Sequence, residues 1–201
     1  MKTIAIIGAG GNAREIAALA SSVGFAVAGF LANTQGAHSS PLLGDFDWLE
    51  RNQVDCLAMG IGSPADKLRV GAALHSRFPD IEWPVLISPG AFVIEQDGFD
   101  PGTIVGPGAV VTVGVRTGVF TQLNFGCTVG HEVEIGAGCL INPGANISGG
   151  VKIGNEVMVG SGAQVLPYLS VGDRAQVGAG AVVTRNVEAG VTVVGIPARP
   201  R

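Results

Sequence analysis

An apolar residue recurs at every sixth position over about half of this chain. The repeat runs from 87 to 183 without insertion or deletion, and fifteen of its seventeen positions are aliphatic, with Phe99 and Thr117 as the exceptions. So short a fixed period leaves few folds open, because every repeat must take the same local structure and bury its apolar residue against its neighbours. The aliphatic positions are Ile87, Val93, Val105, Val111, Leu123, Val129, Ile135, Ile141, Ile147, Ile153, Val159, Val165, Val171, Val177 and Val183.

Each repeat has a second position, mostly small or apolar, two residues earlier, as at Ala109 and Ala163. An inward, outward, inward alternation predicts a short strand, and the glycine-rich remainder, as in 106–108 and 178–180, predicts a turn. Such strands must stack as coils around a shared core. The period therefore predicts a parallel β-helix with three hexads per coil and residues eighteen apart in register. A β-sandwich, whose turns vary in length, is the weaker alternative.

Composition narrows the functional classes. A net charge of -4 without a basic run argues against nucleic acid or an anionic membrane as the partner. The three cysteines form no CxxC pair, which indicates neither a disulfide framework nor a metal site, and Cys127 and Cys139 fall on inward positions. Residues 1–2 lead directly into an apolar strand, without the features of a signal peptide. We expect a cytoplasmic protein without a membrane span.

The first residues predict a ligand-binding turn. A buried-type strand over 3–7 precedes a G-x-G-x-x-G/A pattern, and a helix is expected from Arg14 to about Ser22. In this setting the glycines allow close approach of a phosphate, and the helix start points free N–H groups at it. The predicted acceptor-binding residues of this turn are Gly8, Gly10, Gly11 and Asn12.

Two further strands extend this α/β pattern. The strand over 25–31 ends near Asn33, which is a further candidate acceptor-binding residue. A dinucleotide-binding protein would carry a carboxylate at this place, so NAD is not expected. A strand over 54–60 leads into Gly62, a second candidate ligand position. Tight helix packing is the alternative role of both glycine turns. The sequence predicts an α/β + all-β chain, with a small Rossmann-like nucleotide-sugar-binding domain over 1–83 and a β-helix domain over 84–201.

Within the repeat region there is one histidine, His131, followed by Glu132. Both occupy the turn part of their hexad, so neither side chain can face the core. Histidine is the usual general base near neutral pH, and an adjacent carboxylate can raise its basicity and fix its tautomer. A corner of a prism is also where a second chain can complete a cleft. Without further context, a solvated surface pair remains the alternative.

The hexads resemble the [LIV]-G-x-x-[STAV]-x pattern of the left-handed β-helix acyltransferases. The closing residues 195–199, G-I-P-A-R, resemble the G-x-P-A-[RK] ending of that group, and the glycine-rich α/β part in front is typical of one subfamily. The whole chain is similar to the NeuD/PglD-type sugar acetyltransferases. This resemblance implies a left-handed β-helix, acetyl-CoA as co-substrate, a nucleotide-linked amino sugar or sialic acid as acceptor, a role in bacterial surface-glycan biosynthesis and a homotrimer.

The resemblance also implies site residues. The catalytic pair falls on His131 and Glu132, and Leu140 stands where relatives have a second histidine near the thioester. The last Arg of the closing motif, Arg199, is a candidate for a CoA phosphate contact. The groove for acetyl-CoA maps to Gly149, Ser161, Ala179 and Gly180. The hexad period agrees with two of these pairings, since Ser161 and Ala179 are eighteen residues apart, as are His131 and Gly149.

We interpret these patterns as direct acyl transfer. His131 accepts a proton from the attacking sugar amine, Glu132 steadies the imidazolium, and corner N–H groups with Asn124 stabilise the oxyanion. Sugar O-acetylation is an alternative on the same site, and a catalytically silent nucleotide-sugar-binding β-helix is another. A zinc hydratase of similar shape would need about three histidine ligands, whereas the coils contain one histidine.

Overall fold

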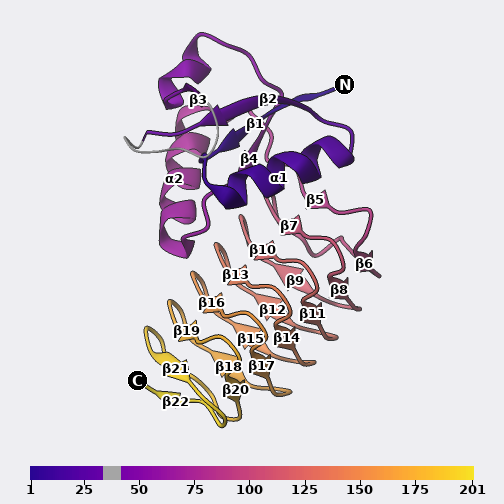
Figure 1. Cartoon of the computed structure of the whole chain (residues 1–201), viewed down its shortest axis with the longest axis vertical. Helices are drawn as coiled ribbons and strands as arrows, with labels where there is room; N and C mark the ends of the chain where they lie inside the picture. The colour runs from indigo at the N-terminus through magenta and orange to yellow at the C-terminus, as the bar shows by residue number, and fades with distance from the viewer. Residues whose placement is uncertain (34–41) are drawn as a thin grey trace.

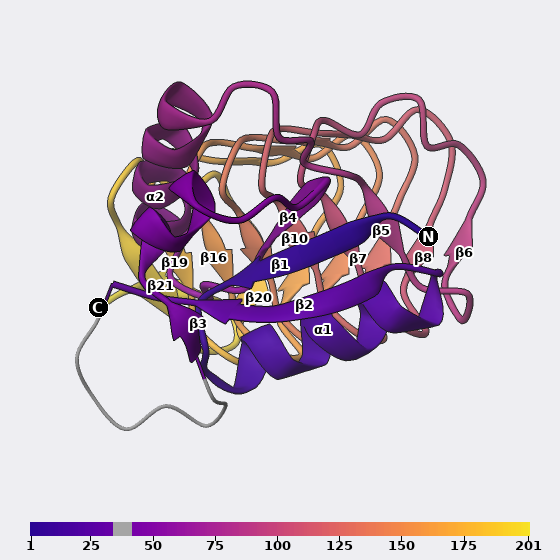
Figure 2. The ribbon, with the colours of Figure 1, turned by 90° about the horizontal axis from the view of Figure 1, so that it is seen from above.

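The computed structural model describes residues 1–33 and 42–201, which form a small α/β unit stacked on a long β-solenoid (Figure 1). The α/β unit has one parallel sheet with strand order β3-β2-β1-β4. Seen from above, the strands and α1 lie across one side of the solenoid (Figure 2). The elements of this unit are β1 (Thr3–Ile7), α1 (Gly11–Ser22), β2 (Ala26–Leu31), β3 (Leu42–Gly44), the 3-10 helix η1 (Phe46–Glu50), β4 (Cys56–Met59) and α2 (Pro64–Arg77).

Two features of the α/β unit differ from the sequence expectation. Helix α1 begins at Gly11 rather than Arg14, because Gly10 serves as its N-cap residue and the glycine-rich segment already takes helical geometry. Helix α2 was not predicted, although Pro64 in its first turn and Asp66 close behind are typical start signals. Its apolar positions are few, so the periodicity of the segment is weak.

The solenoid consists of two- and three-residue strands arranged on three faces. Face 1 comprises β5 (Leu86–Ile87), β7 (Ile104–Val105), β10 (Gln122–Leu123), β13 (Leu140–Ile141), β16 (Met158–Val159), β19 (Gln176–Val177), β21 (Thr192–Val194) and β22 (Arg199–Pro200). Face 2 comprises β6 (Phe92–Val93), β8 (Val110–Val111), β11 (Thr128–Val129), β14 (Asn146–Ile147), β17 (Gln164–Val165) and β20 (Val182–Val183). Face 3 comprises β9 (Arg116–Thr117), β12 (Glu134–Ile135), β15 (Lys152–Ile153) and β18 (Ser170–Val171).

The register confirms the predicted period of eighteen residues. Leu123 pairs with Ile141, and Ile141 pairs with Val159, all in parallel. The sixth-position residues form one continuous buried core inside the coils. The exceptional Thr117 is also buried, and its hydroxyl lies 2.9 Å from that of Thr103, so the two polar groups satisfy each other. The buried side chains of neighbouring coils therefore pack against one another along the whole prism.

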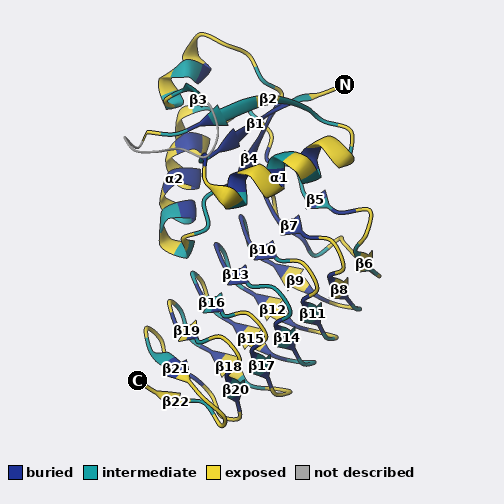
Figure 3. Ribbon diagram, viewed as in Figure 1, coloured by how far each residue is buried: buried dark blue, intermediate teal, exposed yellow. Residues whose placement is uncertain are grey.

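The last coil breaks the period. Val187 bridges to Val171, and Val193 pairs with Val177, so the spacing is sixteen rather than eighteen residues. The chain then reverses, and β22 pairs antiparallel with β21. The outward residues of β9, β12, β15 and β18 are exposed (Figure 3), whereas those of the first strands of face 1 are covered by the α/β unit.

The two units share their hydrophobic cores. Leu86 and Ile104 of face 1 belong to the same buried cluster as Ile4, Ile6 and Ile16 of the α/β unit. On the other side, Phe120 from a solenoid turn packs edge-on against Trp83, with ring centroids 4.8 Å apart. Phe120 also fills the space beside Gly71 of α2, where a Cβ would collide with its ring. The α/β unit is thus held against the coils by packing rather than by the linker alone.

Candidate functional site

The edge between faces 2 and 3, called edge 2–3, carries the predicted catalytic pair. His131 and Glu132 lie in the turn that joins β11 to β12, and their side chains are half and three-quarters exposed. The backbone of Glu132 is left-handed, with φ of 57°, and its N–H donates to the carbonyl of Val113 at 2.9 Å. The His131 carbonyl accepts from the N–H of Gly150 at 2.8 Å. The turn is therefore fixed by the coils on both sides.

The imidazole of His131 lies on the backbone of the next coil. A Cβ built at Gly149 would lie 2.6 Å from Cε1 and 2.7 Å from Cδ2 of His131, and closer still to Nε2. Only glycine leaves room for the ring in this position. The other ring nitrogen, Nδ1, is 3.6 Å from Oε2 of Glu132, which is ion-pair range but longer than a normal hydrogen bond. Glu132 is thus placed beside Nδ1, whereas Nε2 is the ring atom closest to the Cβ position of Gly149.

The edge between faces 1 and 2, called edge 1–2, carries most of the other predicted residues. Asn124 lies in the turn after β10, while Ser161, Ala179 and Gly180 lie in the corresponding turns further along the prism. Ser161, Ala179 and Gly180 are exposed, and the Gly180 N–H donates to the Ser161 carbonyl at 2.8 Å. No heavy atom lies within 4 Å of the position that a Cβ at Gly180 would take. This edge is therefore open to solvent at these three residues.

The structure brings the predicted residues together in two groups, not one. Gly149 lies against His131 on edge 2–3, whereas Asn124 and Ala179 lie on edge 1–2, with all of face 2 between them. Within a single chain these groups cannot contact the same ligand atom.

Leu140 and Arg199 lie away from both groups. Leu140 is buried in face 1 and pairs with Gln122 and Met158. Arg199 is exposed on β22, and its guanidinium donates to the carbonyl of Ala198 at 2.8 Å. Neither side chain contacts His131 in this chain.

The two glycine turns lie side by side at the carboxyl ends of β1 and β4. Gly8 has φ of +104°, and a Cβ there would lie 3.3 Å from the backbone of Gly60. Gly10, Gly11 and Gly62 face open space. By contrast, the Asn33 side chain already has a partner within the protein, because its Oδ1 accepts a hydrogen bond from the N–H of Phe46 at 2.8 Å. The open glycines form the part of this region that a ligand can approach.

A groove of about 370 Å³ runs between α1 and edge 1–2. Its walls are mainly apolar, with Ile16 and Leu19 on one side and Ile104 and Phe125 on the other. Asn124 lies at its rim and supplies an amide. The groove connects the α/β unit with the edge that carries Ser161 and Ala179.

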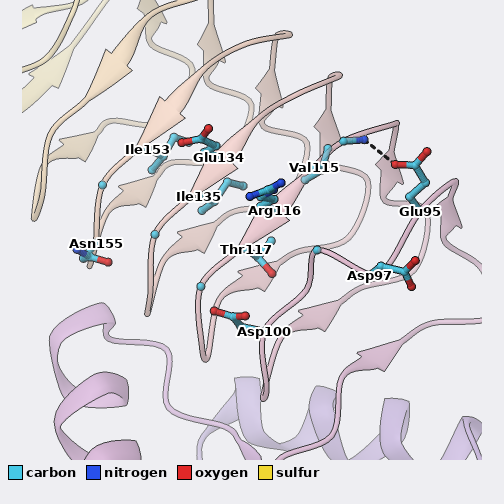
Figure 4. A pocket seen from close by; sticks show the side chains of 15 residues that line it. Glu95, Asp97, Asp100, Val115, Arg116, Thr117, Glu134, Ile135, Ile153 and Asn155 are labelled. Atoms are coloured by element: carbon cyan, nitrogen blue, oxygen red, sulfur yellow. Dashed lines mark hydrogen bonds between the residues drawn. The ribbon is translucent and has the colours of Figure 1, made fainter.

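A larger hollow, of about 830 Å³, lies elsewhere, over face 3 (Figure 4). Its lining includes Glu95, Asp97, Asp100 and Glu134, with Arg116 among them. None of the sequence-predicted site residues lines it. An excess of carboxylates repels phosphate groups, so this hollow is poorly suited to a CoA or nucleotide ligand.

Two buried polar residues were not singled out from the sequence. Gln122 is 4% exposed and contacts Asn12 through its amide. Lys67 on α2 is 1% exposed, and its Nζ donates to the Cys139 carbonyl at 3.5 Å. Burial lowers the pKa of Lys67 to about 8, because no carboxylate compensates the lost hydration. Both residues lie where the α/β unit covers the solenoid, which no local pattern encodes.

Comparison with known proteins identifies the repeat. Residues 150–185 match the model of the bacterial transferase hexapeptide family, which has six repeats. A search of curated protein sequences found no match. Within the described ranges, no helix is long and apolar enough to cross a membrane, and no cluster of three or more potential metal ligands is present.

Solved structures match the full length of the chain. The acetyltransferase domain of PglB from Neisseria gonorrhoeae FA1090 is 30% identical, with 100% of both chains covered and a TM-score of 0.87. PerB from Caulobacter crescentus, in complex with CoA and GDP-perosamine, is 26% identical with a TM-score of 0.90; the match covers 100% of this chain and 98% of that one. WeeI from Acinetobacter baumannii AYE is 25% identical, with 100% of both chains covered and a TM-score of 0.87.

Repeat, register and full-length matches agree on one family. One chain combines hexads in an eighteen-residue register, an α/β unit in front of them and a histidine on an open edge. The chain belongs to the hexapeptide-repeat sugar acetyltransferases, enzymes built on a left-handed β-helix.

Proposed function

We propose that this enzyme transfers the acetyl group of acetyl-CoA to the amine of a nucleotide-linked amino sugar, with His131 as general base. The observation that carries the proposal is that the His131 ring packs against Gly149 and that Glu132 lies next to its Nδ1. The solved relatives support the substrate classes, since one holds acetyl coenzyme A and another holds CoA with GDP-perosamine.

The reaction is proposed as direct transfer. The sugar amine attacks the thioester carbonyl while Nε2 of His131 accepts its proton, and Glu132 stabilises the imidazolium. Asn124 and backbone N–H groups stabilise the oxyanion. The C–S bond then breaks, the amide forms, and the leaving thiolate takes the proton from His131. A cysteine intermediate is disfavoured, because burial raises the pKa of Cys127 to about 12 and that of Cys139 to about 11.

We propose that the site is shared between chains of a homotrimer. Around a three-fold axis, a heterologous contact joins two different surfaces of the same chain. Edge 2–3 of one subunit would then meet edge 1–2 of the next, so that His131 faces the partner's copy of the Asn124 edge. Acetyl-CoA would lie along Ser161, Ala179 and Gly180, with its thioester toward His131.

The surface between the two edges supports this contact. None of the outward strand residues of face 2 is charged, whereas those of face 3 include Arg116, Glu134 and Lys152. Seven of the ten exposed large hydrophobic side chains in the described ranges lie on face 2 or at its edges. Apolar surface of this kind marks a protein interface. The seven are Phe92, Ile94, Val110, Val113, Phe125, Leu166 and Tyr168.

For the acceptor, we propose the glycine turns of a Rossmann-like domain over 1–83. The strand order β3-β2-β1-β4 is the order of dinucleotide-binding sheets, and such sheets bind ligands beyond the carboxyl ends of their strands. Gly10, Gly11 and Gly62 leave room there for a phosphate and the nearby sugar. Action on a surface-glycan precursor in the cytoplasm stays a prediction.

Thiol release from acetyl-CoA across a panel of UDP-, GDP-, dTDP- and CMP-linked amino sugars tests the activity, with product mass reporting N- or O-acetylation. We expect release with an amino-sugar nucleotide and a loss in kcat of roughly 10²-fold or more for His131→Ala. His75→Ala, at an exposed histidine on α2, is the matched control. Near-normal turnover of His131→Ala contradicts the mechanism, and no release with any acceptor contradicts the substrate class.

A mixing experiment tests the shared site. At an acetyl-CoA concentration well below the KM of Ala179→Trp, chains carrying His131→Ala and chains carrying Ala179→Trp should each have low activity alone, and mixed trimers should regain part of the activity. A fully active monomer contradicts this arrangement.

A further inference from the structure

Gln122 is a polar residue in an apolar row. The register places it on face 1 between Ile104 and Leu140, and the next residue of the row is Met158. Its side chain is nevertheless 4% exposed, because α1 covers this part of the face. Burying an amide without partners costs about 1–3 kcal/mol. A glutamine here therefore needs partners, and the structure supplies them from both units.

The partners form one chain of amides across the interface. Gln122 Nε2 donates to Asn12 Oδ1 at 2.9 Å, and Asn12 Nδ2 donates back to Gln122 Oε1 at 3.2 Å. Asn12 Nδ2 also donates to the carbonyl of Gly60 at 3.1 Å. Both N–H groups of Asn12 are thus used inside the protein. Asn12 ties the two glycine turns to the solenoid and has no donor left for an acceptor.

At its other end the chain reaches edge 1–2. Gln122 Nε2 donates its second hydrogen to Asn124 Oδ1 at 3.3 Å. Because the carbonyl end of Asn124 is held in this way, its NH₂ group points away from Gln122. Within the described residues, that NH₂ group has no protein acceptor. Two N–H donors are therefore presented at the edge where the oxyanion is expected to form.

We propose that Gln122 is a positioning residue for acetyl transfer, which turns the Asn124 amide so that its NH₂ group faces the developing oxyanion. Through Asn12 the same side chain holds the glycine turns, and hence the acceptor, at a fixed distance from this amide. The inference rests on the proposed function, because it assigns Asn124 to the oxyanion.

The isosteric variant Gln122→Glu tests the orientation. A carboxylate cannot donate to Asn124 Oδ1, so Asn124 turns to donate its NH₂ group to residue 122 and presents its carbonyl to the site. Loss of one oxyanion donor lowers kcat by about 10²–10³-fold. We expect a loss of this size with little change in KM for acetyl-CoA. Gln176→Glu, in the same row three coils further and exposed, is the matched control and should retain wild-type kcat.

Asn124→Ala is a second variant that should fold normally, because this residue is only half-buried on a turn. It should lower kcat by a similar factor, and at saturating acceptor the double variant Gln122→Glu/Asn124→Ala should have the kcat of Asn124→Ala alone, because the donation to Asn12 that Gln122→Glu also removes affects KM for the acceptor. Wild-type kcat in Asn124→Ala, or additive losses in the double variant, overturns the inference. The proposed function is judged separately, by thiol release in the wild type and its loss in His131→Ala.

Discussion

Gly149→Ala should displace the imidazole of His131, the proposed general base, without disturbing the fold. A methyl group there would lie 2.6 Å from Cε1 of His131, whereas ordinary contacts begin at 3.4 Å, so the ring must move by about 1 Å. The nearest atoms belong to the half-exposed end of a flexible side chain and not to backbone, which makes the movement cheap. A misplacement of about 1 Å can lower a rate by ~10²-fold.

We therefore expect kcat to fall by about 10²-fold in Gly149→Ala. KM for acetyl-CoA should change less than about threefold, because the substitution moves the His131 ring and not the groove. The backbone at Gly149 is not left-handed. The free energy of unfolding should stay within about 1 kcal/mol of the wild type, since an alanine in an allowed conformation restricts the unfolded chain. Steady-state kinetics and urea denaturation measure the two effects.

The decisive control is the His131→Ala background, where no ring is left to displace. Adding Gly149→Ala to that variant should lower kcat no further, because the two substitutions act on one group. Wild-type kcat in the single variant would refute the reasoning. So would an equal further loss in the double variant, since the effect of the methyl group would then be independent of His131.

Three further results are expected. Lys67→Met should raise the free energy of unfolding at pH 7, because it removes a buried charge. The folded pKa of about 8 lies below the ordinary 10.5, so the wild type loses this charge as the pH rises from 8 to 10.5, and the advantage of Lys67→Met should shrink by up to about 3 kcal/mol. An advantage that does not depend on pH would contradict this explanation. Val110→Lys on face 2 should reduce the mass in light scattering from about three chains to one and lower activity more than about tenfold, whereas Ser170→Lys on face 3 should change neither. Ala179→Trp should raise KM for acetyl-CoA more than KM for the acceptor, and equal effects on both would remove Ala179 from the groove.

Periodicity was sufficient to predict the solenoid because its determinants are local. Each hexad contains its own inward residue and its own turn, so the eighteen-residue register follows from counting, and counting alone places His131 beside Gly149. The same counting separates His131 from Ser161, since thirty residues is not a whole number of coils. In the proposed trimer a contact between chains would bring these two edges together, and a sequence period carries no information on such a contact.

The interface between the two units was not predictable in this way. Gln122 occupies an outward position of its hexad and would be expected in solvent, yet α1 covers it. Lys67 belongs to a helix with a weak pattern, and its burial depends on which side of α2 meets the coils. Both environments arise from contacts between residues far apart in sequence. Asn12 was predicted to contact the acceptor. In the structure its side chain forms hydrogen bonds with Gln122 and Gly60, so it lies at the interface between the two units.

The contact of Trp83 with Phe120 makes separation of the two units optically visible. Both tryptophans of the chain, Trp48 and Trp83, lie before the solenoid, and Phe120 reaches into their cluster from a coil. Tryptophan fluorescence therefore reports on the α/β unit and its docking, while far-ultraviolet circular dichroism reports on the coils as well as on α1 and α2. Because the shared clusters leave the α/β unit an incomplete core of its own, the two signals should change together on denaturation. A fluorescence transition well before the dichroism transition would reveal a state in which the coils persist while the α/β unit has come away from them.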